Sequence, residues 1–381
     1  MDHSTMPIED HYLIPSYSKL PFSVEKGQGC YVFDEQGNRF LDLYGGHAVA
    51  LLGHSHPALI QAMVDQASKL FFYSNVAYNS ARAMAAKSLV DWVGGDRQVF
   101  FSNSGAEANE NALKLAQIVT GKDHFVSFSG SFHGRTQGAL AMTGIRKYRD
   151  SSSSKVQFAK FGDIEDLERR LDGSVAAVMF EAIQSLSGVV TASKEYFQAA
   201  VKLCKNTDTL IIFDEIQTGL GRCGHEMYFH DIDINPDFVT LAKGAAGGYP
   251  VGITLAKRDL VKDLKPGHLG STFGGGPLAC ALITKTLSIL KNDHLVGRAR
   301  EQGDKILSIL KNTRHIHEVR GQGLLLGLKT DVPASDLIQR FLKKGIIVGG
   351  SLDPHIVRLL PPLTLSDKDI SLFEHALREI F

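Results

Sequence analysis

The strongest constraint on the fold is an alternation of short, largely apolar segments with helical segments between residues 95 and 256. Strands that are apolar on both faces and separated by helices form mainly parallel sheets covered on both sides. The expected strands are 99–101, 125–128, 176–180, 209–213, 238–242 and 251–256, and the expected helices are 105–119, 163–171 and 194–205. The pattern therefore predicts an α/β fold built around such a sheet.

The two ends of the chain follow a different pattern. YVFDEQGNRFLDL near the N-terminus predicts a hairpin that turns at residues 36–38, and long helical segments alternate with short strands toward the C-terminus. We expect a large domain over residues 46–264 and a smaller α+β domain built from residues 1–45 and 265–381. The serine run at 151–154 predicts an exposed loop.

Composition argues against several functional classes. Lys+Arg and Asp+Glu both total 41, so the balance favours neither nucleic acid nor an anionic membrane surface as a partner. The N-terminus lacks the features of a signal peptide, and no apolar run is long enough to cross a bilayer. The four cysteines are widely spaced, and the histidines of LGHSHP predict a turn before a helix at Pro57. We therefore expect reduced thiols, no metal site and a cytoplasmic protein.

Side chains that can take part in catalysis or binding follow the predicted strands, at the edge where parallel α/β sheets bind their ligands. Glu181 follows 176–180, while Asp214 and Glu215 follow 209–213. The others are Lys243 after 238–242, and Phe132, His133 and Arg135 after 125–128. One edge of the sheet therefore collects a lysine, several acids, an aromatic ring and an arginine.

Two of these features suggest a cofactor. In SNSGAEANE, Ser104 and Glu107 form a capping pattern, and Gly105 lets a phosphate approach the N-terminus of the following helix. Lys243 follows an apolar strand, where desolvation would lower its pKa and free the amine as a nucleophile. Taken alone, each has an ordinary explanation: capped helices are common, and most lysines are solvated.

Together the features match pyridoxal phosphate, which needs a lysine, an acid at the ring nitrogen, a phosphate cup and a sandwich for the ring. Asp214 would keep the ring nitrogen protonated, Ile216 and Phe132 would clamp the ring faces, and Gln217 would bond the ring hydroxyl. A dinucleotide fits less well, because the glycines of RGQGLLLGL at 320–328 do not open a helix and predict a structural strand.

The sequence resembles the class III (fold type I) pyridoxal-phosphate aminotransferases, in their acetylornithine/ornithine branch. The resemblance runs from about Tyr17 to Pro362, so it implies the fold type I architecture for nearly the whole chain. The motifs that carry it are FFSNSGAEANE, SFHGRT, FDEIQTGLGR, the lysine of LAKG, STFGG and RLLPPL.

The resemblance implies roles for individual residues. Lys243 would form the Schiff base and move protons, with Asp214 at the ring nitrogen and Gln217 at the ring hydroxyl. The remaining cofactor contacts would be Gly105 and Ala106 at the phosphate through backbone N–H groups, Phe132 and Ile216 at the ring, and His133 beside them. Thr272 would reach the phosphate of the neighbouring subunit, which implies a homodimer with shared active sites.

The resemblance also implies a substrate pocket with two arginines. Arg135 would pair with the α-carboxylate of the donor, and Arg358 with the carboxylate of glutamate or 2-oxoglutarate, because the guanidinium fork suits carboxylates. Tyr17, His47 and Glu181 would line the same pocket. Taken without the surrounding motifs, either arginine could be an ordinary surface or rim residue.

The sequence departs from the family pattern E-P-[IV]-Q-G-E-G-G at EAIQSLSG, residues 181–188. Leu186 replaces the glutamate that in many relatives pairs with the second arginine, which weakens the case for a donor with a cationic tail. Ala182 and Ser185 replace proline and glycine, and Gly276 replaces the asparagine expected in GGNP. None of these changes touches the Schiff-base residues.

The expected function is transfer of the terminal amine of N-acetyl- or N-succinyl-ornithine to 2-oxoglutarate, in arginine biosynthesis. One alternative is an ω-aminotransferase for ornithine, lysine, γ-aminobutyrate or a diamine. Two others are an aminomutase of the same fold and a non-catalytic relative. Arg135 and Arg358 speak against the aminomutase, and the intact Lys243 and Asp214 speak against the non-catalytic relative.

Overall fold

A computed structural model describes residues 5–149 and 155–381, so the serine run at 151–154 lies outside the described residues. Its largest sheet has seven strands in the order β4-β12-β11-β10-β7-β5-β6. The strands are β4 (Arg97–Ser102), β5 (His124–Phe128), β6 (Val156–Ala159), β7 (Val175–Glu181), β10 (Leu210–Asp214), β11 (Phe238–Leu241) and β12 (Gly252–Lys257). β12 runs antiparallel to both neighbours and the other pairs are parallel, which confirms the predicted α/β fold.

Helices cover both faces of this sheet because its strands alternate apolar side chains between two cores. Ile212 and Met179 belong to the core that α5 (Gly105–Thr120) closes with Ala112 and Ala116. Phe213 and Phe180 point to the opposite face, where α8 (Lys194–Asn206) inserts Phe197. Burial on both faces explains why the strands are almost wholly apolar.

The other elements of the central part connect or flank this sheet. They are α3 (Pro57–Lys69), α4 (Ser80–Val93), α6 (Gln137–Met142), η1 (Arg146–Tyr148), α7 (Ile164–Glu168), β8 (Ile183–Gln184), β9 (Val190–Thr191), α9 (Tyr228–Asp231), η2 (Lys243–Ala246), α10 (Arg258–Val261) and α11 (Pro277–Asn292). α7 is shorter than the expected 163–171, because Asp163 is its N-cap and the chain turns after Arg169. α3 begins at Pro57, as predicted.

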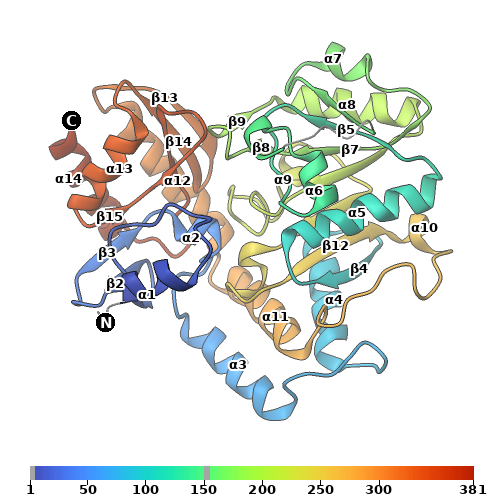
Figure 1. The fold of residues 1–381 in the computed structure, drawn as a ribbon, viewed down its shortest axis with the longest axis horizontal. Coiled ribbons are helices and arrows are strands. Elements are labelled where there is room, and N and C mark those ends of the chain that lie inside the picture. Colours follow the sequence, from blue (N-terminus) through green and yellow to red (C-terminus); the bar gives the residue numbers. More distant parts are fainter. Residues whose placement is uncertain (1–4, 150–154) are drawn as a thin grey trace.

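Two further sheets lie toward the ends of the chain: β1-β2-β3-β15 combines strands from both ends, and β13-β14-β17-β16 consists of C-terminal strands alone. Their elements are α1 (Thr5–Tyr12), β1 (Val24–Gln28), β2 (Tyr31–Asp34), β3 (Arg39–Asp42), α2 (Gly45–Ala48), α12 (Leu295–Lys311), β13 (Ile316–Gln322), β14 (Leu325–Thr330), α13 (Ala334–Lys343), β15 (Ile346–Ile347), β16 (Gly349–Gly350), β17 (Ile356–Leu359) and α14 (Asp367–Ile380). Leu41 of β3 pairs with Ile346 of β15, so the first and last segments lie side by side (Figure 1).

This arrangement confirms the predicted N-terminal hairpin, because β2 and β3 pair antiparallel around residues 36–38. RGQGLLLGL, predicted as a structural strand, instead covers the end of β13, a turn and the start of β14, which pair antiparallel. The division into residues 46–264 and the two flanking segments stays a prediction.

Three smaller observations bear on function. No helix within residues 5–149 and 155–381 is long and apolar enough to cross a membrane. The same residues contain no cluster of His, Cys, Asp or Glu side chains suited to a metal ion, and His54 instead contacts Asp42 at 2.9 Å. Cys30, Cys204, Cys223 and Cys280 are all buried free thiols.

The aromatic core beneath α8 should carry much of the stability. Phe197 is 1% exposed, and its ring centroid lies 5.9 Å from that of Phe180 and 5.8 Å from that of Phe213. Phe197→Ala should lower the free energy of unfolding by about 3–5 kcal/mol, because it removes buried area and leaves a cavity. Chemical denaturation measures this, with Tyr12→Ala at an exposed position as the control. A loss below about 1 kcal/mol would show that the core collapses around the gap.

Candidate active site

The strand order places the predicted residues along one edge of the central sheet. Asp214, the last residue of β10, pairs with Glu181 of β7 on one side and with Thr240 of β11 on the other. Lys243 follows β11 and opens η2. Because these three strands are adjacent and parallel, the lysine, the aspartate and the glutamate meet at their carboxyl ends.

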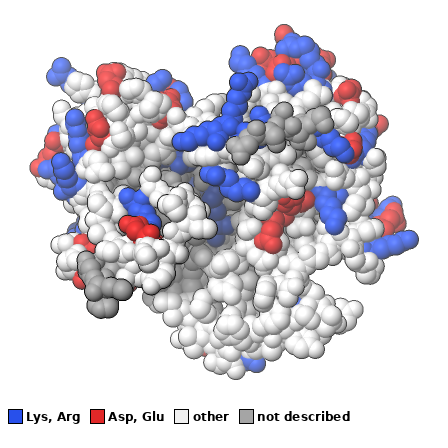
Figure 2. Space-filling view, in the orientation of Figure 1, with Lys and Arg blue, Asp and Glu red and all other residues white. Residues whose placement is uncertain are grey.

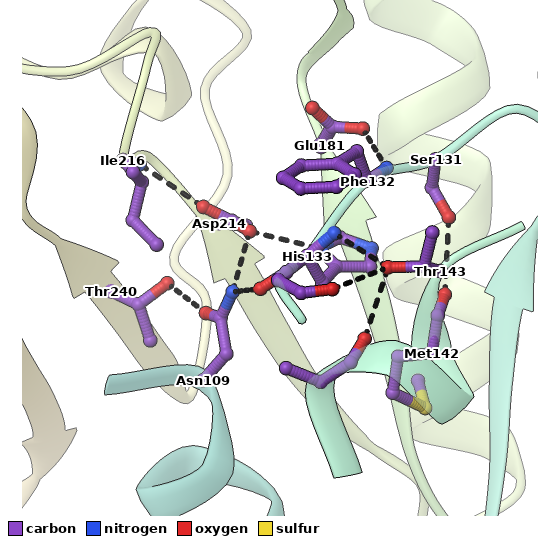
Figure 3. A network of polar contacts seen from close by, with 12 residues as sticks. Asn109, Ser131, Phe132, His133, Met142, Thr143, Glu181, Asp214, Ile216 and Thr240 are labelled. Carbon is purple, nitrogen blue, oxygen red and sulfur yellow. Dashed lines mark hydrogen bonds and ion pairs between the residues drawn. The ribbon is translucent and has the colours of Figure 1, made fainter. Parts of the chain in front are cut away.

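Asp214 is buried in a network of hydrogen bonds, drawn in Figure 3. Its Oδ2 accepts a bond from Asn109 Nδ2 at 2.9 Å and lies 2.8 Å from His133 Nδ1. Its Oδ1 accepts from the backbone N–H of Ile216 at 3.1 Å. These contacts fix the plane of the carboxylate and supply the donors that a buried anion needs.

Asn109 is a functional candidate that the sequence interpretation missed. Its Nδ2 also donates to His133 O at 2.7 Å, and its Oδ1 accepts from Thr240 Oγ1 at 2.7 Å. The amide therefore joins α5, β11 and the loop after β5 around Asp214. The sequence offered one signal for this role: Asn109 is the fifth residue of α5 and lies on the helix face that turns toward the sheet.

Glu215 has a different task from its neighbour Asp214. Its carboxyl accepts from Thr218 Oγ1 and from the backbone N–H of Phe229, at 2.9 Å for the latter. Burial raises the pKa of Glu215 to about 7. The first acid of the pair thus faces the site, and the second holds the loop that follows β10.

Lys243 has both an unusual backbone and an unusual environment. Its φ is 48°, a left-handed value that costs a non-glycine residue of order 1 kcal/mol or more. Desolvation lowers the pKa of Lys243 to about 8, although the charges of Asp214 and Glu181 act in the opposite direction. The amine is therefore much closer to its neutral, nucleophilic form than an exposed lysine.

Glu181 is the second acid at this edge. Its Oε2 accepts from the backbone N–H of Phe132 at 2.7 Å. Burial, and then repulsion from Asp214, raise the pKa of Glu181 well above its ordinary value. The site therefore favours the neutral form of the Glu181 carboxyl group more than water does.

The N-terminus of α5 offers a phosphate cup. Ser104 is the N-cap, and its Oγ accepts from Glu107 N–H, while the Glu107 carboxylate accepts from Asn103 N–H at 2.9 Å. The predicted capping pattern is therefore present, except that the Glu107 carboxylate bonds the N–H of Asn103 and not that of the N-cap Ser104. Gly105 and Ala106 occupy the first two helical positions, whose N–H groups an α-helix leaves unpaired.

These residues fit the cofactor that the sequence predicts. A Cβ added to Gly105 would lie 2.8 Å from Ile216 Cδ1, so glycine allows the N-terminus of α5 to approach Ile216 closely. Gln217 Oε1 is buried without a hydrogen-bond partner among the described residues, and a ring hydroxyl would satisfy it. The site therefore offers a nucleophile, an acid, a phosphate cup and an unused polar atom.

The predicted donor arginine lies at an aromatic corner. The Arg135 guanidinium sits 3.9 Å from the ring centroid of Tyr148 and 5.7 Å from that of Phe132. The side chain is exposed and forms no ion pair with the described residues. Tyr148 was not predicted, because only the path of the chain after α6 brings η1 back to Phe132.

Arg358 is instead buried, at 4% exposed, on β17. Its three donors bond Gly350 O at 2.6 Å, Ser185 Oγ at 3.0 Å and Tyr44 Oη at 2.9 Å. His47 Nδ1 lies 2.8 Å from the same Tyr44 hydroxyl. Arg358 and Lys243 both contribute to lowering the pKa of His47, after desolvation, so these residues share one electrostatic environment.

Two predicted residues do not join this cluster within the described chain. Tyr17 is 81% exposed in the segment after α1, and the Thr272 side chain is exposed in the loop before α11. The loop itself lies near the phosphate cup, because Asn103 Nδ2 donates to Ser271 Oγ at 3.3 Å.

The lowered pKa of Lys243 gives a measurable reactivity. When pyridoxal phosphate is added to the cofactor-free protein, the rate of imine formation should rise about tenfold per pH unit up to pH 8 and then level off, because only the neutral amine attacks. Stopped-flow absorbance measures the rate, and Lys243→Arg should not react. A rate that keeps rising toward pH 10.5, the ordinary lysine value, would contradict the burial argument.

Comparisons with known proteins identify the family of this chain. The family model described as aminotransferase class-III matches residues 12–381. An acetylornithine aminotransferase from Caldanaerobacter subterraneus is 38% identical, with 95% of each chain covered, and one from Archaeoglobus fulgidus is 36% identical, with 95% of this chain and 96% of the relative covered. An ornithine aminotransferase structure from Toxoplasma gondii, reported with partial occupancy of PLP, superposes with a TM-score of 0.93 at 29% identity, covering 98% of this chain and 92% of that one. The chain belongs to the class-III aminotransferases.

Proposed function

We propose that the protein transfers the terminal amino group of N-acetylornithine to 2-oxoglutarate, giving the semialdehyde and glutamate, as a step of arginine biosynthesis. Pyridoxal phosphate is the cofactor, as class-III membership implies. The single observation that carries the proposal is the meeting of Lys243, Asp214 and the cup at Gly105 and Ala106 on one sheet edge. The buried free cysteines are consistent with a cytoplasmic enzyme.

Each group at the edge has a defined task in this reaction. The bound cofactor supplies an electron sink and a covalent attachment point for the amine. Lys243 Nζ would take up the proton from the carbon that bears the donor amine, as a neutral amine with a lowered pKa is able to do. Asp214, held by Asn109 and His133, would keep the ring nitrogen protonated.

The two arginines support an acidic donor and an acidic acceptor. Arg135 lies exposed beside Tyr148 and would bind the α-carboxylate of the donor, whereas the buried Arg358 would bind a carboxylate of 2-oxoglutarate. Figure 2 shows Lys and Arg side chains around the hollow in the middle of the visible face. Several curated relatives named acetylornithine aminotransferase, at 35–38% identity, favour the acetylated donor over free ornithine.

A homodimer would complete the site. Exposed apolar side chains gather on α3, on the segment that follows it and at Phe273 in the loop of Thr272. They are Ile60, Met63, Val64, Leu70, Phe71, Phe72, Tyr73, Val76, Tyr78 and Phe273. Figure 2 shows few charged side chains on the visible face of this part of the molecule. A patch of this kind supports a protein interface, and we propose that Thr272, next to Phe273, acts on the partner's phosphate site.

The donor is tested in half-reactions of the pyridoxal-phosphate form without an acceptor. N-acetylornithine should convert the protein to its pyridoxamine form at least about tenfold more efficiently than ornithine, because ornithine brings a second ammonium next to the guanidinium of Arg135. N-succinylornithine, lysine and γ-aminobutyrate complete the screen. Faster conversion by an unacylated amine would overturn the proposed donor.

The shared site is tested with mixed dimers. Thr272→Ala should weaken cofactor binding about tenfold, because it removes a hydrogen bond to a charged group. Mixing this variant with the inactive Lys243→Ala variant creates dimers with one site that has both an intact lysine and the partner's intact threonine. Activity at limiting cofactor should therefore return on mixing. If Thr272 served its own subunit, or if the protein were a fully active monomer, mixing would restore nothing.

A further inference from the structure

The buried guanidinium of Arg358 is paired with neutral oxygens only. Its hydrogen-bond partners are the Gly350 carbonyl and the hydroxyls of Ser185 and Tyr44, and it forms no ion pair with any described carboxylate. A buried charge is costly unless an opposite charge compensates it. A side chain held in this way is built to receive an anion.

Glu181, the acid that acts electrostatically on Arg358, does not supply that anion. Glu181 acts on Arg358 through space, but its carboxyl accepts a bond from the Phe132 backbone, and burial raises its pKa well above the ordinary value. The other groups that act on Arg358 through space are the Tyr44 and Tyr148 hydroxyls. The Arg358 guanidinium is therefore hydrogen-bonded to no described carboxylate before substrate binds.

The backbone holds Tyr44 firmly in this arrangement. Its ring lies against Gly349, which pairs with Arg358 across the sheet, and a Cβ on Gly349 would come within 1.9 Å of the ring. The Asp42 carboxylate accepts from the N–H groups of Tyr44 at 2.9 Å and Gly45 at 2.8 Å. The next turn is left-handed, with φ of 63° at His47. Such strain persists only where surrounding contacts over-determine the conformation.

We propose that Tyr44 and Ser185 are positioning residues that keep Arg358 ready for a carboxylate throughout the reaction cycle, because they orient its guanidinium without neutralising it. The inference rests on the proposed function, in which Arg358 binds a carboxylate of 2-oxoglutarate or glutamate. An enzyme with this arrangement has no charged partner to displace before the acidic substrate binds. The donor half-reaction, in which the reacting carbon carries no carboxylate, does not use Arg358.

The test compares an acidic and a neutral substitution of nearly equal size. Ser185→Asp places a carboxylate on Arg358, and Ser185→Asn is its neutral control. Isothermal titration calorimetry with glutarate, an unreactive dicarboxylate, reports binding to the pyridoxal-phosphate form. Ser185→Asp should raise the Kd of glutarate and the KM of the glutamate half-reaction at least about tenfold, and Ser185→Asn less than about threefold. In Ser185→Asp, the KM of the glutamate half-reaction should rise at least about fivefold more than that of the N-acetylornithine half-reaction.

Tyr44→Phe provides an independent variant should Ser185→Asp fail to fold. It should raise the same two constants about 2- to 10-fold through the loss of one hydrogen bond. Tyr196→Phe, at a buried tyrosine in the core near Phe197, should leave them unchanged. Equal effects of Asp and Asn at position 185, or parallel losses in both half-reactions, overturn the inference.

Failure of the inference is distinguishable from failure of the proposed function. A wild-type protein that binds no glutarate but reacts with N-acetylornithine overturns both the carboxylate role of Arg358 and the proposed acceptor. The inference is supported if the wild type and Ser185→Asn bind glutarate and Ser185→Asp does not. This holds even if another amine proves to be the donor.

Discussion

The hydrogen bond between Asn109 and Asp214 ties the active site to the fold. A carboxylate buried at the end of a central strand is tolerated only if several donors surround it, and here they come from α5, from His133 and from the backbone of Ile216. Those donors in turn fix the helix that carries the phosphate cup and the loop that carries Phe132. The acid thus sets the relative position of the parts that must hold the cofactor.

The electrostatics of the site follow from which charges are neutralised and which are not. Asp214 is surrounded by donors, Glu181 is driven toward its neutral form, and Lys243 is driven toward the free amine. Arg358 keeps its charge but is held by hydroxyls and a carbonyl. Burial therefore shifts the pKa values of Glu181 and Lys243 toward their neutral forms, whereas Arg358 stays a cation without an ionic partner among the described residues.

The sequence predicted what depends on local pattern and strand order. The sequence predicted Lys243, Asp214 and Glu181 because each directly follows an apolar strand. It predicted α5 because the capping residues lie close together in the sequence. Tyr44 and Asn109 were not accessible, because their roles depend on contacts between segments far apart in the chain. Tyr44 reaches Arg358 only through the pairing of β3 with β15, and Asn109 acts only once α5 lies on the sheet.

The pairing of β3 with β15 also has a consequence for synthesis on the ribosome. Leu41 and Ile346 are roughly 300 residues apart, so the first sheet cannot close until nearly the whole chain has emerged. Until then, β1, β2 and β3 form a sheet whose β3 edge is unpaired while the central sheet folds. An unpaired edge can associate with other chains. The last strands to be made carry Arg358, so its contact with Tyr44 forms only near the end of translation.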